Sequence, residues 1–119
     1  MIDDPQPPAA EPDRPRSARE RLSELAAQAA LATEGVVGLY PSPVDVARPG
    51  ATGVLCAERA DGRYELRVQL AVKPVALREL GDRVRTAVAA AAAGDGLGDR
   101  LGPVDVYIRD IVPPGEVPA

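Results

Sequence analysis

Nine consecutive residues alternate between apolar and mostly polar side chains, and this run constrains the fold more than any other part of the chain. The apolar positions are Tyr64, Leu66, Val68, Leu70 and Val72. Successive side chains of a β-strand point to opposite faces of its sheet. A strand with this pattern therefore has one face in a core and one face in water. We expect the sheet of this chain to have a single apolar face.

Three more strands are expected beside this one. Residues 36–40 and 54–59 are short β-prone runs, and the Asp61-Gly62 pair that follows 54–59 is the strongest short signal for a hairpin. A fourth strand is expected where apolar and polar residues alternate again, at Val104, Asp105, Val106, Tyr107, Ile108 and Arg109.

Two helices are expected, because apolar residues recur there at spacings of three and four. The first, about 18–33, begins at the capping box that Ser17 and Glu20 form, and it ends before Gly35. The second, about 75–93, follows Pro74, whose fixed φ suits a first helical turn. A glycine-rich loop, 94–103, is expected to connect this helix to the last strand.

The expected order is helix, strand, strand, strand, helix, strand. The last two strands are joined through the second helix, so they should lie parallel if they are neighbours, with a right-handed crossover. Because only one face of the sheet is apolar, both helices must cover that face. The predicted fold class is α+β: a two-layer α/β sandwich, order α-β-β-β-α-β, in which two helices cover one face of a four-stranded mixed sheet.

The length of 119 residues fits a single domain. Residues 1–16 include five prolines and four acidic side chains, and such a segment buries too little apolar area to offset its ordering entropy. We predict a disordered head at 1–16, one α/β domain at 17–112 and a loose tail at 113–119.

The composition limits the partners of this chain. It has no Phe, no Trp and three Tyr, so its core is small and aliphatic, and self-association is a common remedy for such a core. A net charge of −4 argues against nucleic-acid binding. No run is apolar enough for a membrane helix, and nothing at the start has the pattern of a signal peptide. We expect a homo-oligomer in the cytoplasm, with no direct membrane insertion.

No group of residues predicts a catalytic, cofactor-binding or metal site. The chain has no His, the usual general acid or base. Its single thiol, Cys56, has no base partner and cannot form a four-ligand zinc site. Cys56 lies in an expected strand and is interpreted as a buried small hydrophobic residue, with a redox role as the alternative.

Two glycine patterns and an alanine run have both structural and functional interpretations. The segment 94–99 follows a helix and precedes a strand, the reverse of a dinucleotide fingerprint. Gly35 and Gly38 match the glycine spacing of a KH-domain RNA clamp, but that clamp joins two helices. The alanine-rich run 87–93 is explained by helix propensity or by close approach of another backbone. Two alternative functions stay open: a small KH-like RNA-binding module, and a small-ligand sensor with 94–103 as a lid over a groove between helices and sheet.

The solvated sheet face is the candidate interaction surface. Exposed charge rows are usually only hydrated, yet an Arg-rich face with a Tyr has a composition that interfaces favour. Its predicted members are Arg63, Glu65, Arg67, Gln69, Tyr107 and Arg109.

The order of elements and several strings also resemble the alkaline-shock-protein family of envelope stress response proteins. The matching segments are 25–30 with 34–39, 64–72, 80–88 and 104–108. The resemblance implies a cytoplasmic, non-enzymatic, self-assembling protein that a membrane-anchored partner holds near the inner membrane face. One departure is that family members often begin with a short extra strand, where this chain has its proline-rich head.

Overall fold

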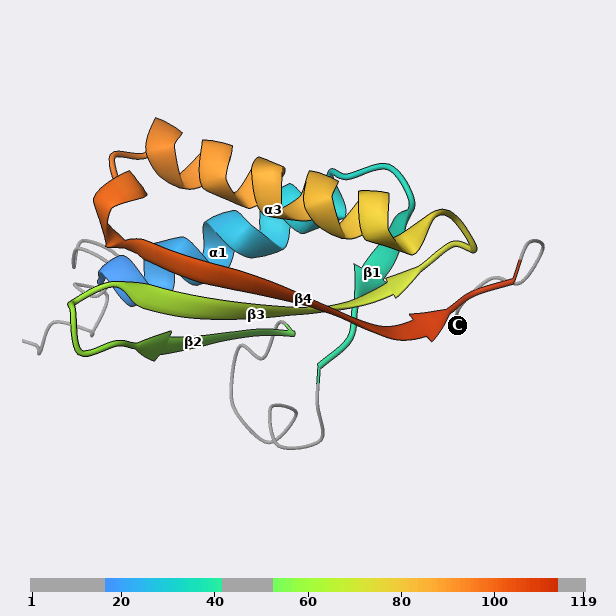
Figure 1. Ribbon diagram of the computed structural model, residues 1–119, viewed down its shortest axis with the longest axis horizontal. Coiled ribbons are helices and arrows are strands. Elements are labelled where there is room, and N and C mark those ends of the chain that lie inside the picture. Colours follow the sequence, from blue (N-terminus) through green and yellow to red (C-terminus); the bar gives the residue numbers. More distant parts are fainter. Residues whose placement is uncertain (1–16, 42–52, 114–119) are drawn as a thin grey trace, which may run out of the picture.

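The structure, a computed structural model, describes residues 17–41 and 53–113. Two helices and four strands account for most of these residues (Figure 1). In chain order the elements are α1 (Ala18–Leu31), β1 (Val36–Leu39), β2 (Val54–Glu58), β3 (Tyr64–Val72), α3 (Leu77–Gly94), a short 3₁₀ turn η2 (Gly98–Arg100) and β4 (Leu101–Ile111).

Strand β3 is the centre of the sheet. Its first part pairs antiparallel with β2, and its last part pairs antiparallel with β1. Both share one edge of β3, because the amide and the carbonyl of Gln69 bond to Gly53, beside β2, and to Tyr40, beside β1. The other edge pairs in parallel with β4. The sheet is therefore mixed and four-stranded, and the predicted parallel neighbours are confirmed.

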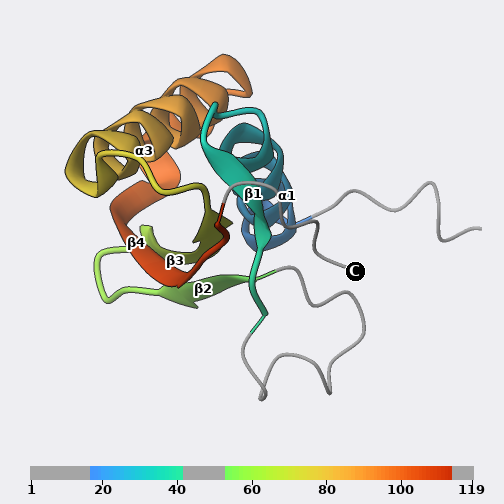
Figure 2. The ribbon, with the colours of Figure 1, turned by 90° about the vertical axis from the view of Figure 1, so that its right-hand side faces the viewer.

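Both helices lie on the same face of this sheet (Figures 1 and 2). Helix α1 contacts β1, β2 and β3, and helix α3 contacts β4. Between the layers, the alternating side chains of β3 pack against apolar positions of both helices. The fully buried members are Leu66, Val68, Leu70 and Val72 of β3, Leu80, Val84, Val88 and Ala92 of α3, and Leu22, Ala26 and Ala30 of α1. This arrangement confirms the predicted two-layer α+β sandwich, and no described helix or strand covers the other face of the sheet.

Local signals place the ends of several elements. The Ser17 hydroxyl accepts from the Glu20 amide at 3.1 Å, while the Glu20 carboxylate accepts from the Ser17 amide at 2.9 Å, so the capping box is confirmed. In the β2–β3 hairpin, Gly62 has a φ of +85° and its amide donates to the Arg59 carbonyl at 3.0 Å. A glycine is favoured there because a left-handed backbone conformation is costly for residues with a Cβ.

Three predicted boundaries were wrong. Helix α1 ends at Leu31, two residues before Thr33, and helix α3 begins at Leu77, so Pro74 lies outside its first turn. The segment 94–103 is not one loop: Gly94 ends α3, a 3₁₀ turn follows, and β4 begins at Leu101. Leu101 is held in the sheet by pairing with Tyr64, which is a long-range contact that the local pattern does not reveal.

Some predictions fall on residues that the structure does not describe. The head, 1–16, and all but the first residue of the tail, 113–119, lie outside the described residues. The proposed domain limits therefore stay a prediction. Within 17–41 and 53–113, none of the helices combines the length and the apolar character that a bilayer crossing demands.

Candidate interaction surface

The uncovered sheet face carries all six predicted surface residues, and we call it the open face. Arg63, Arg67, Tyr107 and Arg109 are exposed, and Glu65 is half-buried. Strand pairing brings them together from two segments of the chain, because Gln69 of β3 lies opposite Tyr107 of β4. The open face is therefore one continuous surface.

Arginine and tyrosine side chains lie against each other on the open face. The Arg67 guanidinium is 5.9 Å from the ring centre of Tyr107, and that of Arg109 is 6.0 Å from the ring centre of Tyr40. Such cation–π contacts contribute about 0.5–1 kcal/mol at exposed sites. Arg109 also donates to the Gln69 side-chain oxygen at 3.3 Å. Tyr40 belongs to this surface but was missed, because it follows a strand whose pairing partner could not be known from the sequence.

Gln69 departs from the prediction of a solvated side chain. It lies on the open face, yet its exposed fraction is 4%. Its side-chain nitrogen is buried and has no hydrogen-bond partner among the described residues. A buried donor without an acceptor costs about 1–3 kcal/mol. The open face therefore contains a buried polar group whose hydrogen-bonding capacity is only partly used.

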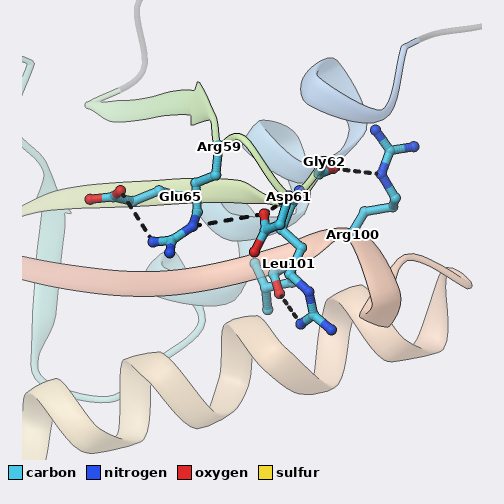
Figure 3. A network of polar contacts seen from close by, with 7 residues as sticks. Arg59, Asp61, Gly62, Glu65, Arg100 and Leu101 are labelled. Carbon is cyan, nitrogen blue, oxygen red and sulfur yellow. Dashed lines mark hydrogen bonds and ion pairs between the residues drawn. The ribbon is translucent and has the colours of Figure 1, made fainter.

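The hairpin end of the open face is held by polar contacts within the chain (Figure 3). Arg59 lies 3.8 Å from the carboxylates of both Asp61 and Glu65. Arg63 donates to the Leu101 carbonyl at 3.3 Å, and Arg100 donates to the Gly62 carbonyl at 3.1 Å. Exposed pairs of this kind add little stability. They do show that Arg63 joins the hairpin to β4 and that Glu65 contacts Arg59 within the hairpin, which leaves Arg67, Gln69, Tyr107 and Arg109 as the centre of the surface.

A groove of about 830 Å³ lies on the helix side of the molecule. Its lining comes from the end of α1, the turn after β3 and the outer face of α3, and includes Glu34, Lys73, Asp82 and Arg83. The segment 94–103 does not contribute to this lining, so the predicted lid is not part of the groove. Ala87 and Ala90 do line it, which places part of the alanine run on a surface open to solvent.

The glycine patterns have structural roles. Gly35 has a φ of +101° at the turn between α1 and β1, and Gly38 lies inside β1. The pair therefore joins a helix to a strand, whereas an RNA clamp of the KH type joins two helices. The segment 94–99 connects α3 to β4, as the structural interpretation predicts.

Cys56 is half-buried. It packs against the main core cluster around β3 and against a smaller cluster of Leu22, Tyr64, Ala92 and Leu97. Burial raises the pKa of its thiol, while the charge of Arg19 and a hydrogen bond with Ser23 act in the lowering direction. A reactive cysteine needs a lowered pKa, so the shift favours the interpretation as a small hydrophobic residue.

Comparisons with known proteins identify the fold and no family. No family model matches the chain, and no curated protein matches it. Among solved structures, a MamM CTD in a copper form has a TM-score of 0.55 and 16% identity, over 83% of this chain and 91% of that one. A MamM CTD variant in a zinc form has a TM-score of 0.49 and 18% identity, over 79% and 87%. At 16% identity, the likeness to the copper form shows a similar fold alone. The likeness to the zinc form, with a TM-score below 0.5, supports no conclusion.

These comparisons correct the expected resemblance to the alkaline-shock-protein family, which was wrong. No family model supports it, and the similar structures are MamM CTDs. The role in envelope stress is withdrawn with it. Some of those structures are named for a metal form, and the residues described here contain no group of three His, Cys, Asp or Glu that could hold a metal ion. The comparisons thus show a likeness of fold to a MamM CTD and leave the family of this chain open.

Proposed function

We propose that this chain is a non-catalytic protein-interaction module that self-associates and uses the open face as its contact surface. The observation that carries the proposal is the pair of exposed tyrosine rings, Tyr107 and Tyr40, each with an arginine guanidinium against it on the open face. Arg and Tyr are enriched where interfaces have their binding energy. A partner that packs on this surface would remove the exposed ring of Tyr107 from water.

The chemistry of the described residues supports a binding role over a catalytic one. The thiol of Cys56 has a raised pKa, which is the opposite of an activated nucleophile. The chain has no His to serve as a general base. The aliphatic core, with Tyr64 as its buried aromatic residue, is small, and association with a second copy would add apolar burial.

Other expectations about partners stay predictions. The net charge of −4 disfavours binding to nucleic acid, and a cytoplasmic location is consistent with the sequence pattern. The membrane-anchored partner followed only from the withdrawn family resemblance, so it is not part of this proposal.

Sedimentation velocity over a series of protein concentrations tests the proposal. The wild-type chain should sediment faster as its concentration rises, and Arg67→Ala and Tyr107→Ser should shift the transition to higher concentration. Arg78→Ala is the matched control, because Arg78 is exposed on α3, away from the open face. A wild-type chain that stays monomeric at every concentration would contradict self-association, and an equal effect of all three variants would contradict the assigned surface.

A further inference from the structure

Strand β4 is a free edge of the sheet. It runs from Leu101 to Ile111, eleven residues, and among the described strands it pairs with β3 alone. Figure 2 shows β4 at the edge away from β1, below α3. A long edge strand presents backbone donors and acceptors that another strand can bind. The side chain of Tyr107, in the middle of β4, is 42% exposed.

The direction of the backbone groups along β4 follows from the pairing of β3. Successive residues of a strand point their peptide groups to opposite edges. The amide of Gln69 donates to Gly53 at 2.9 Å, on the β2 side, so Val68 and Leu70 point theirs toward β4. In a parallel pair of strands, the amide and the carbonyl of one residue form hydrogen bonds with the two residues that flank its partner on the other strand.

This rule shows which backbone groups of β4 point away from β3. Val68 lies opposite Val106 and Leu70 lies opposite Ile108, so the peptide groups of Asp105 and Tyr107 point to β3. Those of Val106 and Ile108 point outward. The carbonyl of Val104 has the same outward direction, and it accepts from the Arg85 guanidinium of α3 at 3.2 Å.

The sequence of this free stretch is complementary to itself. It reads Asp105-Val106-Tyr107-Ile108-Arg109, with opposite charges at equal distances from a central tyrosine. If two copies pair antiparallel about Tyr107, Asp105 of each copy lies opposite Arg109 of the other, the residue at which the register with β3 shifts after Ile108. The pairing also places Val106 opposite Ile108, so the outward peptide groups of the two copies meet. No ion pair or hydrogen bond joins the Asp105 carboxylate to another described residue, and Arg109 is exposed.

We propose that β4 pairs antiparallel with β4 of a second copy, centred on Tyr107, to join the two sheets into one. This inference rests on the proposed self-association, and it places the contact at the β4 edge of the open face, where Tyr107 and Arg109 lie. The tyrosines form a non-hydrogen-bonded pair, in which side chains are closest, and Arg67 lies over the ring of each. Arg109 donates to Gln69 through one guanidinium nitrogen, so its other nitrogens can pair with Asp105 of the second copy while this hydrogen bond is kept. Because each copy has one such edge, the assembly closes at two copies.

Disulfide cross-linking tests the register. In a Cys56→Ala background, Tyr107→Cys places two thiols directly opposite each other, at a spacing that a disulfide accepts. Under mild oxidation this variant should form a covalent dimer in high yield. Arg109→Cys is the matched control, because its two thiols would be about 14 Å apart along the strands and should not cross-link. Equal cross-linking of both variants, or none of Tyr107→Cys in a dimeric sample, would overturn the register.

A charge exchange tests the same pairing without a covalent bond. Asp105→Arg and Arg109→Asp each create like-charged pairs across the interface, so each should weaken dimerisation by about tenfold. The double variant restores opposite charges and should recover wild-type dimerisation. Circular dichroism of each variant reports whether the monomer is folded. Failure of the double variant to recover, with the fold intact, would overturn the ion pairs and hence the pairing.

The experiments distinguish a failure of the proposed self-association from a failure of the proposed β4 pairing. A wild-type chain that is monomeric at all concentrations contradicts the proposed function itself. A wild-type dimer that shows neither the Tyr107→Cys cross-link nor the charge effect contradicts only the β4 pairing. Strand addition by another protein would appear as a monomeric chain whose β4 amides become protected from hydrogen exchange when that protein is added, and this outcome also overturns pairing with a second copy.

Discussion

At the scale of single residues, Gln69 is the most informative position of the chain. The period of β3 predicts the face on which its side chain lies, but it does not predict that neighbouring groups cover it. Burial depends on which strands flank β3, and on Arg109, forty residues later in the chain. For the same reason the sequence did not reveal Tyr40 as a member of the open face.

Replacing Gln69 by methionine should separate stability from binding. Gln69→Met removes the buried amide that lacks an acceptor, so the free energy of unfolding should rise by about 1 kcal/mol, while self-association through the β4 edge should be unchanged. Urea denaturation followed by circular dichroism measures the first effect, and sedimentation velocity measures the second. Gln28→Met, at an exposed position of α1, serves as the control. Clear destabilisation by Gln69→Met would show that the amide is satisfied in the isolated chain.

The Cys56 thiol should react slowly in the folded protein. Burial raises its pKa, so the thiol keeps its proton to higher pH in the folded chain than in the unfolded one. The protonated thiol thus contributes stability below its unfolded pKa, and this contribution is lost as the pH rises through the folded pKa. Alkylation followed by mass spectrometry should be slower for folded than for urea-unfolded protein at each alkaline pH. Equal rates would mean that the fold neither shields the Cys56 thiol from the reagent nor raises its pKa.

At the scale of elements, the pattern of β3 determines which side chains stabilise the fold. Leu66→Ala should lower the free energy of unfolding by about 2–5 kcal/mol, because it leaves a cavity between the layers. Its neighbour Arg67 is exposed on the open face, so Arg67→Ala should change stability by about 0.5 kcal/mol or less. Urea denaturation compares the two variants. Similar losses for both would mean that β3 does not have one buried and one open face.

The turn after α1 gives a second test at this scale. Gly35 has a φ of +101°, and a Cβ there would approach a Leu80 methyl group to 3.3 Å, whereas a Cβ at Gly38 meets nothing within 4 Å. Gly35→Ala should therefore lower the melting temperature by several degrees, for a loss of about 1–2 kcal/mol. Gly38→Ala should leave it unchanged or raise it. A lower melting temperature for Gly38→Ala than for Gly35→Ala would contradict the assigned backbone conformation at this turn.

The existence and order of the elements could be predicted because helix and strand periods are local. Their ends could not, because pairing with distant residues determines them. Leu101, Gly102 and Pro103 have no alternating pattern, yet they belong to β4 because β3 holds them in register. Pro74 suited a helix start by its own geometry, but the chain still has to turn away from β3, and α3 begins three residues later.

At the scale of the whole molecule, one apolar sheet face was sufficient to predict two layers with both helices on one side. The family resemblance was wrong for a related reason. Its matching strings are helix and strand periods in a particular order, and any two-layer sandwich of that order imposes similar periods on its sequence. A shared pattern of this kind supports a fold, while function depends on the particular residues of a site.

Hydroxyl-radical footprinting at low and high protein concentration tests the central claim most directly, namely that one sheet face is sealed by helices and the other is free to bind a second copy. The account predicts that Leu66 and Leu70 stay unlabelled at both concentrations. Tyr107 should be labelled in the dilute protein and protected in the concentrated one. Labelling of Leu66 and Leu70 to the level of Tyr107, or a Tyr107 signal that does not depend on concentration, would contradict it.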